Sequence, residues 1–156
     1  MSSIPQNQNN LTKNQLEALL RARLYENEGK KRSAYQDSLG YWTIGCGRLI
    51  DARKNGGLSD VEIDYLLTND IQTARNDLQS YSWYQKQDQV RKDVLVELCF
   101  NLGLAGLLGF KKMIGALDTT NYKLAVAELL DSKWATQVGN DRINDLVYRL
   151  KNGAYQ

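Results

Sequence analysis

Residues 40–47 read Gly40-Tyr41-Trp42-Thr43-Ile44-Gly45-Cys46-Gly47, and this stretch decides the fold. Aromatic and β-branched side chains fill its centre, and glycines punctuate it, which is the pattern of a short strand between turns. More strand-forming residues and glycines lie on both sides of it: Tyr35, Ile50, Gly56 and Gly57. We therefore expect about three short antiparallel strands between Lys30 and Leu58. A sheet this small is not stable alone, so it must pack against helices.

Helical periodicity surrounds this segment on both sides. Before it, leucines recur at helical spacing from Leu16 to Leu24, and the predicted helix runs to about Glu28, where Gly29 is a stop signal. After it, Ser59 and Glu62 form an S-x-x-E capping box that starts a second helix. The apolar pattern then predicts helices over about 63–78, 90–102, 107–117, 121–131 and 143–150, with a glycine-rich turn at Gly103 and Gly106.

The predicted fold class is α+β and mainly helical, with two lobes. We expect a flexible polar tail over residues 1–10 and a single domain over residues 11–156. The small antiparallel sheet lies in an N-terminal lobe of about 29–58. The C-terminal lobe is helical, covers about 59–156, and includes the N-terminal helix. A cleft between two lobes is the usual place for a ligand.

Composition excludes several classes of function. The 156 residues include 20 basic and 18 acidic side chains, a balance that does not indicate nucleic-acid binding. Histidine is absent, which removes Ser-His and Cys-His catalysis and disfavours zinc, so we expect no metal and no cofactor. Cys46 and Cys99 are predicted to be buried free thiols, as suits a reducing cytoplasm. We see no signal peptide and no membrane-spanning stretch, and expect no membrane insertion.

Two acidic residues and a threonine suggest a catalytic group. Asp37 follows Glu28 by nine residues, and Thr43 follows Asp37 by six. A helix end and a nearby strand can direct two carboxylates at one cleft, and paired carboxylates are the usual equipment of glycoside hydrolysis. Most of the 18 acidic residues are nevertheless expected to be solvated, and Glu26 is a competing acid. On a helix Glu26 and Glu28 point to different faces, so only one should face the cleft.

The motifs resemble the phage-type lysozymes, glycoside hydrolase family 24. The signature is carried by Glu28-Gly29, by Tyr35-Gln36-Asp37 and by residues 40–47. Weaker matches follow in the right order and extend the resemblance over nearly the whole chain from Leu16: Phe100-Asn101-Leu102-Gly103, Ala105-Gly106 to Phe110, Ser132-Lys133-Trp134 and Arg142. The resemblance implies a lysozyme-like two-lobe fold.

The resemblance also implies roles for single residues. Glu28 would be the general acid, Asp37 would activate water on the opposite face of the sugar, and Thr43 would position that water. The reaction would invert the anomeric centre, which needs roughly 6.5–9.5 Å between the carboxyl groups. Arg142 matches an arginine that pairs with the catalytic glutamate. Four further positions are expected to line the substrate cleft: Leu49, Phe100, Asn101 and Phe110.

The chain departs from the family pattern at two positions near the site. Asn27 stands where the family often has aspartate, and Arg48 stands where it often has histidine. We expect the supporting ion pair to be lost or replaced by an Asn27–Arg48 hydrogen bond. Arg48 also belongs to a basic cluster of the small lobe, which would help to hold anionic peptide stems: Lys30, Lys31, Arg32, Arg48, Arg53 and Lys54.

The resemblance implies an endolysin muramidase that hydrolyses the β-1,4 bond between N-acetylmuramic acid and N-acetylglucosamine in peptidoglycan. The enzyme would be monomeric, accumulate in the host cytoplasm, and reach the cell wall in the periplasm with the help of a separate holin. A lytic transglycosylase is the nearest alternative, although it would not need Asp37 and Thr43 to position water. A non-catalytic glycan-binding or virion protein with the same fold is the alternative outside enzymes.

Overall fold

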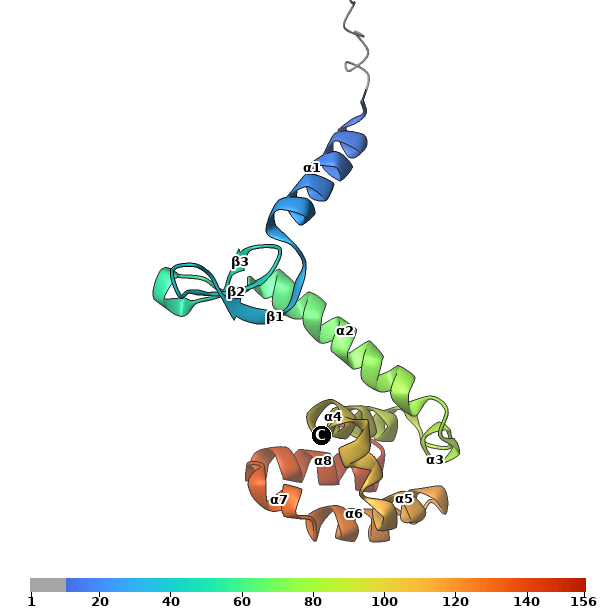
Figure 1. Cartoon of the computed structure of the whole chain (residues 1–156). Coiled ribbons are helices and arrows are strands. Elements are labelled where there is room, and N and C mark those ends of the chain that lie inside the picture. The colour runs from blue at the N-terminus through green and yellow to red at the C-terminus, as the bar shows by residue number, and fades with distance from the viewer. Residues whose placement is uncertain (1–10) are drawn as a thin grey trace, which may run out of the picture. The chain divides into compact units, whose positions relative to one another are not determined.

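The structure is a computed structural model that describes residues 11–156, so the predicted polar tail lies outside the described residues. The described chain divides into two compact units, one ending at Glu62 and the other spanning Ile63–Gln156. Helices predominate and the sheet is small and antiparallel, which confirms the predicted fold class (Figure 1). The predicted lobe boundaries, with the N-terminal helix joining the helical lobe, stay a prediction.

The first unit consists of one long helix and a three-stranded sheet. Its elements are α1 (Lys13–Glu28), β1 (Lys31–Gln36), β2 (Trp42–Gly45), β3 (Arg48–Leu49) and a short 3-10 turn, η1 (Ala52–Lys54). The strands follow the order β1-β2-β3 and neighbours pair antiparallel, as the strand-forming residues and glycines around Thr43 predict. The register shifts between Lys31 and Tyr35, where β1 carries an irregularity.

Local signals fix both ends of α1. Thr12 and Gln15 form a capping box, in which the Thr12 hydroxyl accepts from the Gln15 amide at 3.3 Å and the Gln15 side chain accepts from the Thr12 amide at 2.8 Å. The helix ends at Glu28, as predicted, because Gly29 adopts φ 74°, a backbone region that favours glycine. Glu28 is therefore the last helical residue before the sheet.

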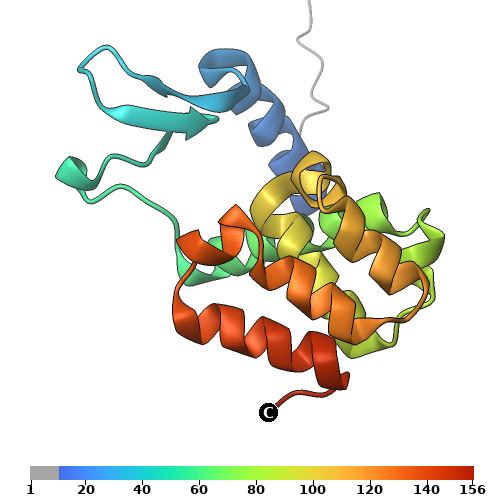
Figure 2. The same ribbon diagram turned by 90° about the horizontal axis from the view of Figure 1, so that it is seen from below.

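The second unit is a set of helices around a shared apolar core. They are α2 (Asp60–Leu78, which begins in the first unit), α3 (Ser82–Gln85), α4 (Gln89–Leu108), α5 (Lys111–Asp118), α6 (Tyr122–Leu130), α7 (Lys133–Gln137) and α8 (Asn140–Asn152). Figure 2 shows α6 and α8 side by side. The most buried side chains of α4, including Leu95 and Leu98, form the centre of this core.

The predicted turn is present at Gly103 but not at Gly106. Helix α4 departs from helical geometry at Gly103 (φ 71°, ψ 164°) but continues through Gly106 to Leu108. Leu107 is fully buried, so its packing outweighs the poor helix propensity of the nearby glycines. A second break lies at Gly109 and Phe110, and the next helix begins at Lys111 rather than at Leu107. Helices α3 and α7 are too short to show a periodic pattern in the sequence.

Among residues 11–156, no single helix has the length and apolar composition to cross a membrane. By length and composition alone, α4 and α5 together pass that test as a pair bent by 101°.

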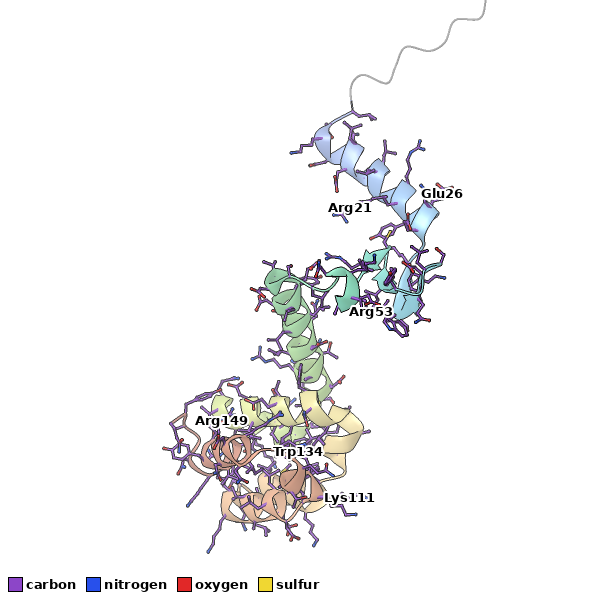
Figure 3. All side chains as sticks on the ribbon, turned by 90° about the vertical axis from the view of Figure 1, so that its left-hand side faces the viewer. Arg21, Glu26, Arg53, Lys111, Trp134 and Arg149 are labelled. Carbon is purple, nitrogen blue, oxygen red and sulfur yellow. The ribbon has the colours of Figure 1, made fainter. Side chains whose placement is uncertain are left out.

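One buried arginine joins α4 to α8. Arg149 is 2% exposed and donates to both oxygens of Glu97, at 2.8 and 3.1 Å, and from Nε to Asp145 at 2.9 Å. Burial alone would lower the pKa of Arg149, but the hydrogen bonds to Glu97 and Asp145 outweigh it and raise that pKa above its ordinary value. Figure 3 labels Arg149 within the helical unit. The guanidinium is thus a buried charge with its partners in place.

We predict that Arg149→Met lowers the free energy of unfolding by about 2 kcal/mol, because the ion pairs with Glu97 and Asp145 disappear. The loss stays below that of a fully buried pair because the Glu97 and Asp145 side chains are 42% and 46% exposed and can hydrate. Urea unfolding measures the effect. The control is Lys151→Met on the exposed side of the same helix. Equal unfolding midpoints for the two variants would contradict this prediction.

Candidate active site

The Glu28 side chain lies against the turn between β2 and β3. A methyl group at Gly47 would stand 3.2 Å from Glu28 Oε2 and 3.6 Å from its Cδ, and Gly47 itself has φ 70°. The last glycine of the 40–47 stretch therefore leaves room for the Glu28 carboxylate. The neighbouring Cys46 thiol donates to the Leu24 carbonyl at 3.4 Å, one helical turn before Glu28. The end of α1 is thus held on this turn.

Asp37 opens the turn between β1 and β2. Its Oδ1 accepts from the backbone amides of Leu39 and Tyr41, both at 2.9 Å. Within the part of the chain that the structure describes, Oδ2 has no hydrogen-bond partner. The carboxylate is half-buried, with one oxygen fixing the turn and the other left for a ligand. This arrangement holds Asp37 in place without using up its capacity to accept a proton.

Thr43 is buried on β2 and is linked to Asp37 through one carbonyl group. The Thr43 hydroxyl donates to the Tyr41 carbonyl at 3.2 Å, and the same carbonyl accepts from the Asp37 amide at 2.9 Å. Thr43 pairs with Tyr35 on one side and with Leu49 on the other. Residues opposite each other share a face of the sheet, so Tyr35, Thr43 and Leu49 lie on one face, and Asp37 follows Tyr35 by two residues just after β1 ends.

The two predicted catalytic carboxylates belong to residues just before and just after β1 in the chain. Glu28 precedes this strand and contacts the turn after β2, whereas Asp37 follows the strand and forms the turn before β2. The carboxyl separation expected for inversion stays a prediction. Glu26, the competing acid, is exposed on the last turn of α1 (Figure 3). Glu28 is exposed too, but it follows Glu26 by two residues and so points to a different face of the helix. The contact with Gly47 therefore distinguishes Glu28 from Glu26.

An aspartate that the sequence did not single out supports the Asp37 turn. Asp51 is 4% exposed and accepts from the Trp42 amide at 3.1 Å and from Arg53 Nε at 2.9 Å. Arg53 also donates to the Gly40 carbonyl at 3.0 Å, so the pair fastens the loop after β3 to the turn that carries Asp37 (Figure 3 labels Arg53). The Arg53 side chain, followed by the Trp42 amide, holds the pKa of Asp51 well below its ordinary value of 3.8.

The lowered pKa of Asp51 predicts part of the acid sensitivity of the first unit. A carboxylate with a depressed folded-state pKa stabilises the fold above its unfolded value, and that stabilisation is lost as pH falls through the folded value. Stability of the native chain should therefore decline as pH drops below about 4. Asp51→Asn should be less stable at pH 7 and show a flatter decline. Unfolding midpoints between pH 7 and pH 2 measure this, and parallel curves for both proteins would refute it.

In the helical unit, three predicted residues gather around Trp134. The indole Nε1 of Trp134 donates to Asn101 Oδ1 at 2.7 Å, and the Arg142 guanidinium carbon lies 5.8 Å from its ring centroid. Trp134 and Phe110 together line an open hollow of about 690 Å³. Figure 3 labels Trp134 inside this unit and Lys111 at its edge. The structure thus brings Asn101, Phe110 and Arg142 together, and Trp134 is the residue that they share.

Phe100 lies apart from this group. Its ring is 49% exposed and lines a second hollow of about 450 Å³, which it shares with Ile71 and Arg142. Arg142 therefore lies near the Trp134 ring and also lines the hollow that contains Phe100. The predicted role of Arg142 as the partner of Glu28 stays a prediction.

Of the two outcomes expected for the supporting ion pair, its loss is the one observed, because no hydrogen bond joins Asn27 to Arg48. Arg48 instead makes an ion pair with Glu62 and donates to the Gly57 carbonyl at 3.3 Å. Glu62 also accepts from the amide and hydroxyl of Ser59, at 2.8 and 3.0 Å, so the predicted capping box is present and Arg48 joins it. The start of α2 attracts Arg48 because Glu62 is already oriented there. Cys46 and Cys99 are free thiols, as predicted, although Cys46 is only half-buried.

Comparison with known proteins agrees with these features. The family model described as phage lysozyme matches residues 25–152. Probable T4-type lysozyme 1 of Dictyostelium discoideum is 24% identical over 81% of this chain and 89% of its own length. Probable T4-type lysozyme 2 of the same organism is 27% identical, over 76% and 85% of the two chains. The SAR-endolysin of Haemophilus phage HP1 is 30% identical, over 65% and 55%.

Proposed function

Because this chain belongs to the phage lysozyme family, we propose that it hydrolyses the β-1,4 bond between N-acetylmuramic acid and N-acetylglucosamine with inversion. The family makes it a lysozyme, a glycosidase of peptidoglycan. The observation that carries the finer proposal is the link between Asp37 and Thr43, which both donate to the Tyr41 carbonyl. A fixed carboxylate beside a fixed hydroxyl is suited to hold one water molecule.

We propose that Glu28, Asp37 and Thr43 have separate roles in the reaction. Glu28 donates its proton to the oxygen of the departing sugar, while Asp37 takes a proton from the attacking water. Thr43 orients that water through its hydroxyl oxygen. The C–O bond to the leaving sugar breaks as the new bond to water forms on the opposite face. The free Oδ2 of Asp37 supports this role, because its Oδ1 already accepts two backbone hydrogen bonds.

Mass spectrometry of digested peptidoglycan distinguishes hydrolysis from lytic transglycosylation. A hydrolase adds one water molecule and leaves a reducing N-acetylmuramic acid end. A transglycosylase needs a single acid and leaves a 1,6-anhydro end without added water. We expect reducing ends only. A predominance of anhydro ends would reject the roles of Asp37 and Thr43 in positioning water.

We propose that the Trp134 hollow and the Leu49 side of the sheet both contact substrate. The hollow combines the Phe110 and Trp134 rings with polar and charged rim residues, which suits a sugar or peptide that has apolar and hydrogen-bonding faces. The Asn101 side chain fixes the Trp134 ring. Phe100 offers a further exposed ring.

The basic cluster gives a separate prediction about cell-wall binding. Arg48 and Arg53 are occupied by Glu62 and Asp51, whereas the other four cations make no ion pair with any residue from 11 to 156: Lys30, Lys31, Arg32 and Lys54. Changing these four to Gln should weaken binding to purified cell walls about fivefold or more at low salt, and little at ~0.5 M salt. Sedimentation across a salt series measures the effect.

A control with the same change of charge replaces four other cations by Gln: Lys13, Arg23, Lys123 and Lys151. If both quadruple variants lose binding equally, net charge rather than the basic cluster attracts the cell wall. Binding of the first variant that matches the native protein at every salt concentration would reject the cluster altogether.

We also propose a place for the enzyme in the infected cell. It acts as an endolysin that accumulates in the host cytoplasm, relies on a separate holin to reach the periplasm, and works there as a monomer. One of its relatives carries the name SAR-endolysin. Fractionation of infected cells before lysis, with and without the holin, tests this. Enzyme found in the periplasm without a holin would reject the dependence.

A further inference from the structure

A polar hollow of about 500 Å³ lies in the helical unit where α2, α3 and α4 meet, away from the Trp134 hollow. Its lining includes four glutamines and two cations: Gln72, Gln79, Gln85, Gln89, Arg75 and Lys92. None of its lining residues is acidic. Exposed amides beside two cations are a combination that the proposed lysozyme chemistry does not use.

The glutamine side chains are oriented by the protein itself. Gln85 Nε2 donates to the Gln79 carbonyl at 2.6 Å, and Gln89 Nε2 donates to Asp93 Oδ1 at 2.8 Å. Because a backbone carbonyl and a carboxylate can only accept, the amide groups cannot be reversed. Their Oε1 atoms have no partner among residues 11–156. These two side chains therefore present acceptors, and a matching ligand must bring hydrogen-bond donors.

Arg75 and Lys92 give the hollow positive charge beside the glutamine acceptors. Arg75 meets Asp93 only at 3.9 Å, and that carboxylate is already shared with Gln89 and with the Tyr155 hydroxyl at 3.1 Å. Lys92 makes no ion pair within the described chain, and its Nζ lies 5.6 Å from the centroid of the Tyr84 ring. The hollow thus keeps a positive charge that an anionic ligand would neutralise.

A buried tyrosine adds a donor to the same hollow. Tyr84 is 8% exposed, and in the region that the structure covers its hydroxyl makes no hydrogen bond. A tyrosine is neutral and able to donate at physiological pH, and burial raises the pKa of Tyr84 still further. The hollow therefore combines one neutral donor, oriented acceptors and two cations.

We propose that this hollow binds a sugar that carries one anionic group, either a carboxylate or a phosphate. Sugar hydroxyls would donate to the Gln85 and Gln89 oxygens, and the anionic group would pair with Arg75 and Lys92. Inorganic phosphate has one or two hydroxyl donors at neutral pH, fewer than a sugar, so it would use these acceptors less well. The site is separate from the residues assigned to hydrolysis, so it would attach the enzyme to acidic glycans independently of catalysis.

Amide chemical shifts of the full chain test this proposal. Titration with glucuronic acid and with glucose 6-phosphate should move the signals of residues around Gln85 and Gln89, and the two sugars show which anionic group is preferred. Glucose and inorganic phosphate should bind at least about tenfold more weakly. The double variant Arg75→Gln, Lys92→Gln should lose the acidic sugars, and Gln89→Leu should weaken both sugars but not phosphate.

A charge-matched variant and a folding measurement serve as controls for the titrations. Lys13→Gln, Arg23→Gln removes the same charge elsewhere and should bind like the native chain, while thermal midpoints show that each variant is folded. Equal shifts with inorganic phosphate would mean a simple anion site and overturn the proposal. Equal shifts with glucose, or no shifts with either acidic sugar, would overturn it as well. None of these results depends on hydrolysis of peptidoglycan.

Discussion

Glu28→Gln will leave outer-membrane-permeabilised bacteria intact under conditions in which the native enzyme clears the suspension. We expect the rate of clearing to fall at least ~10³-fold, because an amide cannot give the leaving oxygen its proton. Glutamine has the same shape, so the contact with Gly47 and the end of α1 should persist. The turbidity assay should be accompanied by an unfolding midpoint close to that of the native chain.

Glu26→Gln is the matched control for this experiment. Glu26 lies on the same helical turn but on another face, so its loss should leave clearing almost unchanged. Normal clearing by Glu28→Gln together with inactive Glu26→Gln would reverse the assignment. If the Glu28 variant clears normally and so does the Glu26 variant, neither residue is the acid. A folded Glu28→Gln that still binds cell walls would show that binding and catalysis are separable.

Asp37→Asn should lower the rate of hydrolysis at least ~10²-fold while preserving the fold. Asparagine keeps the side-chain oxygen that accepts from the Leu39 and Tyr41 amides, so the turn between β1 and β2 remains. What disappears is the proton-accepting capacity of the second oxygen. The initial rate of release of reducing ends from peptidoglycan measures the effect.

Asp37→Ala separates the two functions of this side chain. It removes the turn-forming oxygen as well, so it should lower the unfolding midpoint, which Asp37→Asn should not. The assignment of Asp37 as the base fails if Asp37→Asn keeps more than half of the native rate. It also fails if loss of activity in the two variants simply follows their loss of stability.

The sequence predicted those parts of the fold that depend on local signals. Gly29 ended α1, the glycines and β-branched residues around Thr43 gave the three strands, and Ser59 with Glu62 began α2. The end of α4 could not be predicted, because burial of Leu107 depends on the whole core and outweighs Gly106 locally. Tertiary packing, rather than propensity, decided that boundary.

For the candidate site, too, some residues could be predicted from the sequence and others could not. Spacing and resemblance identified Glu28, Asp37 and Thr43, but the Tyr41 carbonyl that links two of them carries no sequence signal. Asp51 and Arg53 were also missed as a pair, although an acid two residues before an arginine, just after a strand, was a usable hint. Trp134 appeared only as part of a weak motif, and its bond to Asn101 spans 33 positions.

The stereochemistry of the first product tests the central claim most directly. Proton magnetic resonance of a glycan oligomer during the first turnovers reports the anomer released before mutarotation. If Glu28 donates the proton and Asp37 activates water on the opposite face, cleavage of a β bond gives the α-anomer first. Initial release of the β-anomer, or of an anhydro sugar, would contradict these roles for Glu28 and Asp37.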